Sequence, residues 1–187
     1  MKVISVAHTE APARKPFSNP LSRIFNPAVQ KQPAIAAAAE FSAFPRMFNG
    51  PVAVDAPALM VSRKVDSVAP ALDWFRAQGV KCYHLDHFAD ALAVALESPR
   101  AWSYLIVDID DFGGVDGIID EMMQLRLAVP GLPVILLSSG FAVNDFGSDR
   151  LYVADASLRL PLSFRALELA AEDAPRNNRE WRARNPA

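Results

Sequence analysis

The stretch WSYLIVDIDDFGGVDG, from Trp102 to Gly117, decides how the chain folds. Its apolar run, residues 104–107, has no polar alternation, which is typical of a strand buried on both faces of a parallel sheet. The run ends abruptly at Asp108. Because ligand sites in open α/β sheets lie just beyond the carboxyl ends of the strands, Asp108 is expected at the edge where such folds bind their ligands. A lone aspartate at this place also serves, in many proteins, only to cap the following loop.

Similar apolar runs recur along residues 58–173 and alternate with segments of helical periodicity. The alternation predicts an α/β fold of the order (βα)5, with five parallel strands in one doubly wound sheet and helices on both of its faces. The segment 141–150 is so weakly patterned, with Gly147 inside it, that any helix there should be short. The expected strands span 58–61, 80–85, 103–108, 133–137 and 152–158, and the last helix is expected from Ser163 to about Glu172.

Residues 1–57 are expected to form an irregular arm, extended or disordered, because proline at this density breaks helices and sheets alike. One short helix, around Ile35–Phe44, is compatible with the composition. The arm is nonetheless rich in aromatic residues, which disordered segments normally lack. Two interpretations stay open: the arm packs on the domain, or its apolar clusters are docking motifs for a partner. One cluster comprises Phe17, Leu21, Ile24 and Phe25, and the other comprises Phe41, Phe44, Met47 and Phe48.

The net charge of −2 conceals a segregation of charge along the chain. Residues 58–173 hold 9 Lys/Arg against 17 Asp/Glu, a net of −8, whereas residues 1–57 hold 6 against 3 and residues 174–187 hold 4 against 1. The body is therefore acidic, and the arm and the C-terminal tail each carry a net +3. This basic tail is polar and expected to be loose. Basic flanks of this kind contact nucleic acid, anionic membranes or the acidic body itself, and they also serve solubility alone.

Several classes of protein are disfavoured by the composition. The single cysteine, Cys82, forms no internal disulfide and no CxxC metal pair. The longest apolar stretches are far shorter than a membrane span, and the N-terminus has too short an apolar run for a secretory signal. A cytoplasmic protein without a membrane span is expected.

Four segments in succession resemble the receiver domain of bacterial two-component response regulators. The segment LIVDID at 105–110 resembles the third strand of that domain, with Asp108 in the place of the phosphoacceptor. Ser138 stands at the family's hydroxyl position, at the end of the fourth strand. The resemblance covers about 58–173 and implies the flavodoxin-like receiver fold. The other three segments are VDGI at 115–118, PVILLSS at 133–139 and ASLRLPLSFRALEL at 156–169.

The chain departs from the family at the positions that support phosphorylation. The resemblance places the family's acidic pair, which holds a divalent ion, at Ser62 and Arg63, and the family's lysine at Leu160. All three positions are degenerate, since none carries the residue that the family uses. A salt bridge from Arg63 to Asp108, which would imitate a filled site and hold the domain in one conformation, is favoured over a rebuilt metal site.

A metal site rebuilt from the remaining acids is a weaker expectation. Asp110 and Asp111 lie in the same loop as Asp108 and are the only candidate replacements for the missing ligands. Hard cations need several carboxylates that converge, and adjacent acids in a loop are more often simply solvated. No metal or other cofactor is therefore expected, except Mg²⁺ if Asp108 is a working phosphoacceptor.

The leading hypothesis is a degenerate receiver, a pseudo-receiver, that acts in bacterial signalling as a protein-interaction module and not as an enzyme. Its partner would be another signalling protein, such as a histidine kinase or a regulator, and residues 141–172 would form the partner or homodimer surface. The first alternative is a phosphoaccepting receiver that uses Asp108 in a two-component phosphorelay. The second is a nucleic-acid-associated regulator that binds through its basic flanks. It ranks last because the chain lacks a helix-turn-helix region and a dense interleaving of aromatic and basic residues.

Overall fold

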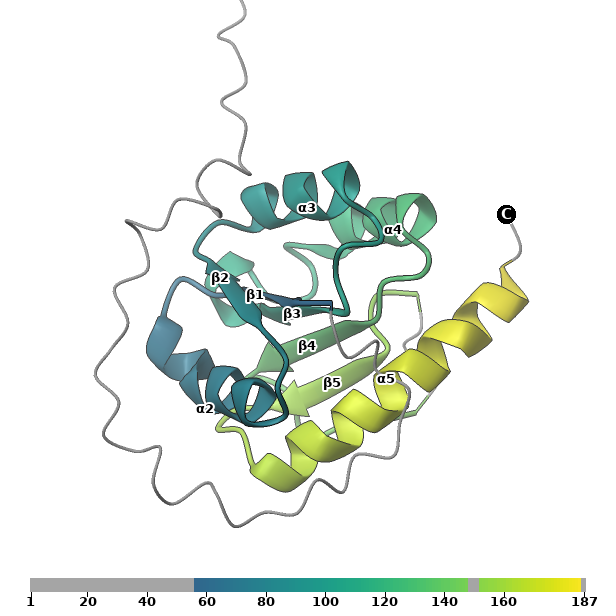
Figure 1. Ribbon diagram of the computed structural model, residues 1–187. Helices are drawn as coiled ribbons and strands as arrows, with labels where there is room; N and C mark the ends of the chain where they lie inside the picture. The colour runs from purple at the N-terminus through teal and green to yellow at the C-terminus, as the bar shows by residue number, and fades with distance from the viewer. Residues whose placement is uncertain (1–55, 148–151, 186–187) are drawn as a thin grey trace, which may run out of the picture.

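The computed structural model describes residues 56–147 and 152–185, which contain one parallel five-stranded sheet of order β2-β1-β3-β4-β5 (Figure 1). This order confirms the predicted doubly wound sheet. The predictions for residues 1–55, among them the cluster of Phe17, Leu21, Ile24 and Phe25, lie outside the described residues. The strands are β1 (Ala58–Val61), β2 (Cys82–Leu85), β3 (Tyr104–Asp108), β4 (Val134–Ser138) and β5 (Ala156–Arg159); the helices are α2 (Val65–Ala77), α3 (Phe88–Glu97), the 3-10 helix η3 (Asp110–Phe112), α4 (Ile119–Ala128) and α5 (Phe164–Arg184).

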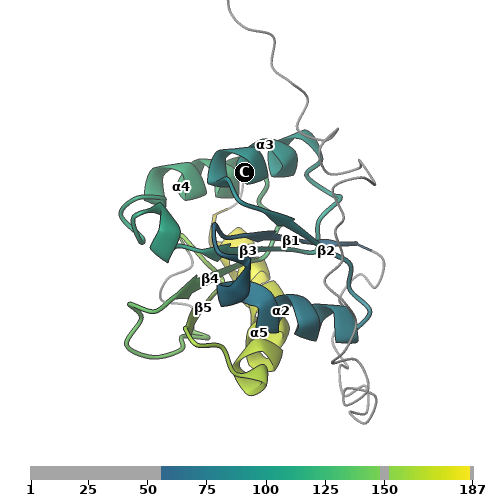
Figure 2. The same ribbon diagram turned by 90° about the vertical axis from the view of Figure 1, so that its left-hand side faces the viewer.

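The strands separate two apolar layers, because successive side chains of a strand point to opposite faces of the sheet. On one face, residues such as Met60 and Ile106 pack with α2 and α5. On the other, residues such as Val61 and Val107 pack with α3 and α4. Figure 2 shows the two pairs of helices on opposite sides of the sheet. The central strands are thus buried on both faces, as their unbroken apolar runs predict.

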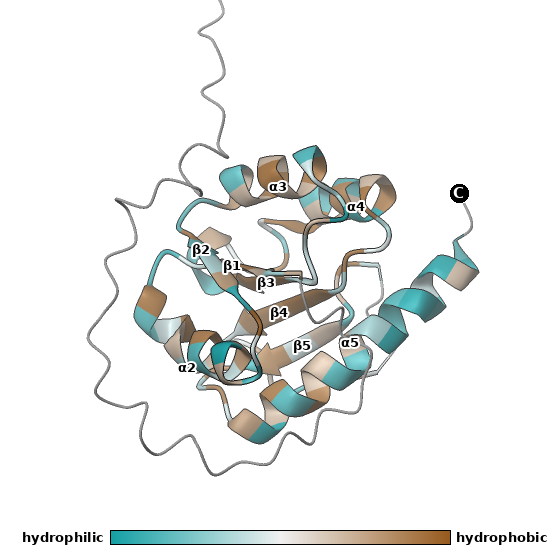
Figure 3. Ribbon diagram, viewed as in Figure 1, coloured by the Kyte–Doolittle hydropathy of each residue, from teal (hydrophilic) through white to brown (hydrophobic). Residues whose placement is uncertain are grey.

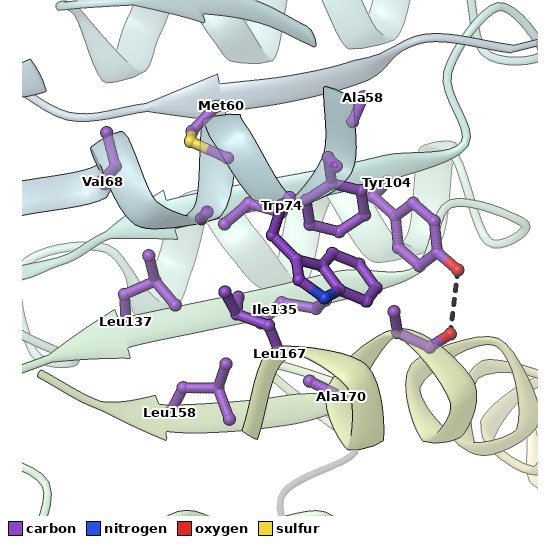
Figure 4. Packing of buried hydrophobic residues seen from close by; sticks show 14 of the residues in the cluster. Ala58, Met60, Val68, Trp74, Tyr104, Ile135, Leu137, Leu158, Leu167 and Ala170 are labelled. Carbon is purple, nitrogen blue, oxygen red and sulfur yellow. Dashed lines mark hydrogen bonds between the residues drawn. The ribbon is translucent and has the colours of Figure 1, made fainter. Parts of the chain in front are cut away.

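The layer between the sheet and α2 and α5 contains an aromatic cluster (Figure 4). The Phe75 ring lies 4.9 Å from the Trp74 ring and 5.4 Å from the Tyr104 ring, between ring centroids. The Tyr104 hydroxyl donates a hydrogen bond to the Ala171 carbonyl oxygen at 2.9 Å. This bond satisfies the one polar group of a buried side chain and ties α5 to the central strand.

Helix α5 is longer than the sequence pattern predicts. The expected loose tail is instead helical as far as Arg184, and Trp181 is only 6% exposed. The prediction was wrong because the second half of the helix is mainly hydrophilic (Figure 3), and its buried Asn177 and Asn178 resemble solvent-facing residues in sequence. Although α5 is long, it is too polar to cross a membrane, and none of the other described helices meets that requirement.

The connection from β4 to β5 contains no helix in its described parts, residues 139–147 and 152–155. The short helix expected within 141–150 is therefore not found in the described part of that segment. Asp145 instead pairs with Ser157: its amide donates to the Ser157 carbonyl at 2.7 Å and its carbonyl accepts from the Ser157 amide at 2.8 Å. These bonds cover the outer edge of β5.

Strand β5 begins at Ala156, later than the predicted residue 152, because Asp155 is held at the amino end of the sheet. Its carboxylate, 0% exposed, forms two hydrogen bonds with the Arg126 guanidinium, each of 2.9 Å, and accepts a third from the Val134 amide at 2.8 Å. The Arg126 guanidinium also lies over the Trp181 ring, 4.4 Å from its centroid. The ion pair therefore joins α4, β4 and β5 to the second half of α5.

Replacing Asp155 should destabilise the fold strongly. Asp155→Ala leaves the Arg126 charge buried without a counter-ion, and the free energy of unfolding should fall by about 3–5 kcal/mol. Urea denaturation measures the loss. The matched control is Asp73→Ala, because Asp73 pairs at 3.5 Å with Arg76 and the two side chains are 60% and 54% exposed, and exposed pairs contribute at most about 1 kcal/mol. Equal losses in the two variants would contradict the role given to the buried pair.

Candidate functional site

Asp108 lies at the carboxyl end of β3, where the sequence pattern places it, and is only 2% exposed. Ser67, in the first turn of α2, donates a hydrogen bond from Oγ to Asp108 Oδ2 at 2.6 Å. The Asp110 amide donates to Asp108 Oδ1 at 3.2 Å. Both oxygens of the Asp108 carboxylate therefore accept a hydrogen bond from the chain itself.

Ser67 has two acceptors within reach of one hydroxyl proton. Its Oγ lies 2.6 Å from Asp108 Oδ2 and 2.8 Å from the Lys64 carbonyl oxygen. A carboxylate is the stronger acceptor, so the proton goes to Asp108 when that group is ionised. Ser62, at one of the two acid-pair positions, is buried, and its Oγ lies 3.2 Å from Ser67 Oγ. One serine hydroxyl, that of Ser67, thus bonds to Asp108, and a second one, that of Ser62, stands where the family resemblance leads one to expect a carboxylate.

Asp110 accepts hydrogen bonds from the end of β4. The Ser138 hydroxyl donates to Asp110 Oδ1, and Ser139 donates to Oδ2 from its amide at 2.8 Å and from its hydroxyl at 2.6 Å. Burial acts to raise the pKa of Asp110, but these hydrogen bonds and the nearby charge of Lys64 outweigh it and lower the pKa below its ordinary value. The hydroxyl of Ser138 is thereby bonded to Asp110.

Asp111 is bound to the residues that follow β1. Lys64 Nζ lies 3.5 Å from Asp111 Oδ1, and the Arg63 amide donates to Asp111 Oδ2 at 3.1 Å. The expected salt bridge between Arg63 and Asp108 is not formed among the described residues. The Arg63 guanidinium lies instead over the Phe112 ring, 5.3 Å from its centroid, which is a cation–π contact. Helix η3 positions the Phe112 ring so that it contacts the Arg63 guanidinium.

Leu160, at the lysine position, packs against the apolar layer of α2 and α5. Arg159 is the cation next to it in sequence. Its guanidinium donates to the Ala142 carbonyl at 2.9 Å and its amide donates to Asn144 Oδ1 at 2.8 Å. The positive charge of Arg159 is thus engaged with the segment before β5.

No family model matches this chain, and no curated protein matches it in sequence. Among solved structures, it is similar to a response regulator receiver domain protein from Clostridium thermocellum, with a TM-score of 0.50 and 16% identity over 67% of this chain and 98% of that chain. The chain has the receiver fold. It is also similar to a protein described as pilus assembly-related from Burkholderia pseudomallei, with a TM-score of 0.52 and 19% identity over 66% of this chain and 92% of that chain. At these identities the likeness is one of fold.

The receiver fold brings most of the predicted site residues together. Hydrogen bonds link Asp108, Asp110 and Ser138, and Asp111 joins them through the loop after β1, where Ser62 and Arg63 lie. These acids do not fit a divalent ion, because each is bonded to a different set of donors. Among residues 56–147 and 152–185, no group of three or more His, Cys, Asp or Glu side chains converges on a metal position.

Two serines that bond to Asp108 and Asp110 escaped the sequence analysis. Ser67 and Ser139 supply hydroxyl donors to Asp108 and Asp110. His84 Nε2 lies 2.9 Å from the Ser62 carbonyl oxygen, and burial lowers the pKa of His84, which favours the neutral ring. The place of Ser67 in the sequence could have predicted its role. It stands in the first turn of the helix after the first strand, and that turn faces the carboxyl edge of the sheet.

The burial of Asp108 predicts a specific dependence of stability on pH. Burial raises its pKa above the ordinary value of 3.8, and the hydrogen bonds from Ser67 and Asp110 offset part of that rise. The folded state then binds the proton more tightly than the unfolded state, so this residue's contribution to stability is full at low pH and falls as the pH rises through the folded pKa.

Asp108→Asn removes this titration. The free energy of unfolding of the variant, minus that of the unchanged protein, should rise as the pH is raised from 3.8, the ordinary pKa of the group, towards neutrality. Urea denaturation across that range measures the difference. Replacing a hydrogen-bond acceptor shifts the difference by the same amount at every pH, so it does not affect how the difference changes with pH. A difference that stays level or falls would show that the pKa of Asp108 is not raised.

Proposed function

We propose that this chain is a receiver-like signalling module that acts by binding another protein, without efficient phosphorylation of Asp108 and without enzymatic activity. The observation that carries the proposal is the hydrogen bond of 2.6 Å from Ser67 to Asp108, which, with the Asp110 amide, gives each carboxylate oxygen a donor from the chain and holds the carboxylate in place. The nucleophile of a phosphoacceptor must be oriented towards the incoming phosphoryl group.

The charges around Asp108 also support the proposal. A carboxylate that attacks a phosphoryl group brings two anions together, and a divalent ion or a fixed cation must offset their repulsion. Asp110 and Asp111 already accept hydrogen bonds from serines and from the loop after β1. The two nearest candidate cations are engaged as well, since Lys64 pairs with Asp111 and Arg63 lies on Phe112.

The same contacts suit a fixed scaffold better than a switch. Asp110 connects the end of β3 to Ser138 and Ser139, and Asp111 connects it to the end of β1. A module with these bonds already in place presents one surface without any covalent signal. Asp108→Asn, which keeps the shape of the side chain, is therefore expected to leave partner binding unaltered.

The partner surface that we propose spans residues 141–172, with the arm cluster of Phe17, Leu21, Ile24 and Phe25 as a second contact. Its described part exposes three large apolar side chains: Val143 at 71%, Tyr152 at 66% and Phe164 at 47%. Exposed large apolar side chains favour a protein partner or a second copy of the chain over nucleic acid. The chemistry fits another signalling protein, such as a kinase or a regulator.

Treatment with acetyl phosphate and millimolar Mg²⁺ tests the proposal. Intact mass should show no stoichiometric phosphoryl adduct on the unchanged protein, because Lys64 and Arg63 have other partners and do not offset the repulsion at Asp108. The matched variant restores the family's residues by Ser62→Asp, Arg63→Asp and Leu160→Lys, and it should gain an adduct if it folds. Arg63→Asp with Leu160→Lys, which spares the buried Ser62, serves as the milder version.

A gain of one phosphoryl group on the unchanged protein, lost on Asp108→Ala, would overturn the proposal. The chain would then be a phosphoaccepting receiver with an unusual metal site.

A further inference from the structure

The absence of a helix between β4 and β5, in the part of the chain that the structure describes, leaves a groove of about 420 Å³ over that end of the sheet. Its floor is made by Leu136 of β4 and Ser157 of β5. Its walls come from the loop before α4 and from the two described pieces of the β4–β5 connection. They comprise Val115, Phe141, Tyr152, Val153 and Ala154.

This groove is apolar but only partly closed by its own walls. Leu136 and Ala154 are 2% exposed, whereas Tyr152 on the rim is 66% exposed. Met123 and Leu127 of α4, which are 44% and 75% exposed, are separated by one helical turn and extend the apolar surface of that helix. The size of the groove and its place in the fold suit a short helix with large apolar side chains.

We propose that the groove is occupied by residues 35–48 of the same chain, IAAAAEFSAFPRMF, which lie outside the described residues. Residues 35–44 have the composition of a short helix that Pro45 would end. In such a helix Phe41 and Phe44 share a side, and the alanines at 36–39 let the backbone approach the sheet closely. Phe48 follows the proline as a third anchor.

The connection is long enough for this docking. Residue 56 precedes β1, and eight residue-to-residue steps join it to Phe48, so the link spans up to roughly 26 Å. Strands in a sheet are about 4.8 Å apart, so β4 and β5 lie roughly 10–14 Å from β1. The displacement along the strands is also small. Ala58 pairs with Tyr104 and Leu105 pairs with Val134, so Leu136 in the groove floor lies only a few residues beyond the level of Ala58. Charge also agrees, since Arg46 of the segment would approach the exposed Asp116 next to Val115.

The consequence is regulation of the proposed partner surface by the chain itself. The groove lies within residues 141–172 and the adjacent α4 loop, so the docked segment would compete with a partner for the same apolar side chains. This consequence rests on the proposed function, whereas the docking itself does not. A measurement of docking without any partner therefore separates failure of the inference from failure of the proposed function.

Hydrogen–deuterium exchange on the full-length chain tests the docking. Three proteins are compared: the unchanged chain, the variant Phe41→Ser, Phe44→Ser, Phe48→Ser, and the matched control Phe17→Ser, Leu21→Ser, Phe25→Ser. In the variant of Phe41, Phe44 and Phe48, peptides that cover residues 136–141 and 152–157 should exchange roughly tenfold faster. This factor corresponds to an unchanged chain in which the docked state is about ten times as populated as the open state. The control variant should exchange like the unchanged chain.

A second pair of variants probes the groove side. Tyr152→Asp should speed exchange of the same peptides and of residues 35–48, whereas Val143→Asp, at a position 71% exposed and outside the groove lining, should not. Exchange that is equal in all the proteins overturns the inference. Faster exchange in the control variant also overturns the inference, because the cluster of Phe17, Leu21 and Phe25 would then be the occupant. Protection that grows with protein concentration also overturns it, because a second copy would then fill the groove.

Discussion

The buried ion pair between Arg126 and Asp155 is the contact on which the arrangement of the last third of the fold depends. It lies at the amino ends of the strands, with both side chains at most 2% exposed, and it joins α4, β4, β5 and α5. Asn178 adds a hydrogen bond to the Leu132 carbonyl, and Asn177 adds one to the Asp155 carbonyl. The described parts of the β4–β5 connection, residues 139–147 and 152–155, contain no helix, and these polar contacts join the amino ends of β4 and β5 to α4 and α5.

The carboxyl edge of the sheet holds a second buried carboxylate, and its surroundings are different. Burial raises the pKa of both acids, but Asp108 has no arginine partner among its hydrogen bonds, only a serine hydroxyl and a backbone amide. Neutral donors satisfy the hydrogen-bonding capacity of a carboxylate but do not cancel its charge. Asp155 therefore ties several elements together through an ion pair, whereas Asp108 stands at the end of β3 with only neutral hydrogen-bond donors.

The sheet could be predicted from sequence because its signal is local: three unbroken apolar runs, at 58–61, 104–107 and 134–137, and the Asp108 that ends the second of them. The contacts that decide the site are not local. Ser67 reaches Asp108 across 41 positions, and Arg126 meets Asp155 across 29, so neither pairing leaves a trace in spacing or periodicity.

The incorrect predictions have the same origin. Arg63 was expected to pair with Asp108 on charge alone, yet the Phe112 ring takes up the guanidinium. Trp181, Asn177 and Asn178 looked like a solvated tail because their partners, including Arg126 and Phe146, come from other elements. A buried asparagine cannot be told from an exposed one until its acceptors are known.

A titration with Mg²⁺, followed by the NMR signals of the side-chain carboxyl carbons, tests most directly whether the Asp108 site is closed by its own hydrogen bonds. The account predicts that the signals of Asp108, Asp110 and Asp111 shift only weakly and without saturation up to about 10 mM Mg²⁺, because each acid is already bonded to different donors. Saturable shifts of these three signals, with a midpoint below about 1 mM, would show that the acids converge on a metal and would contradict the account.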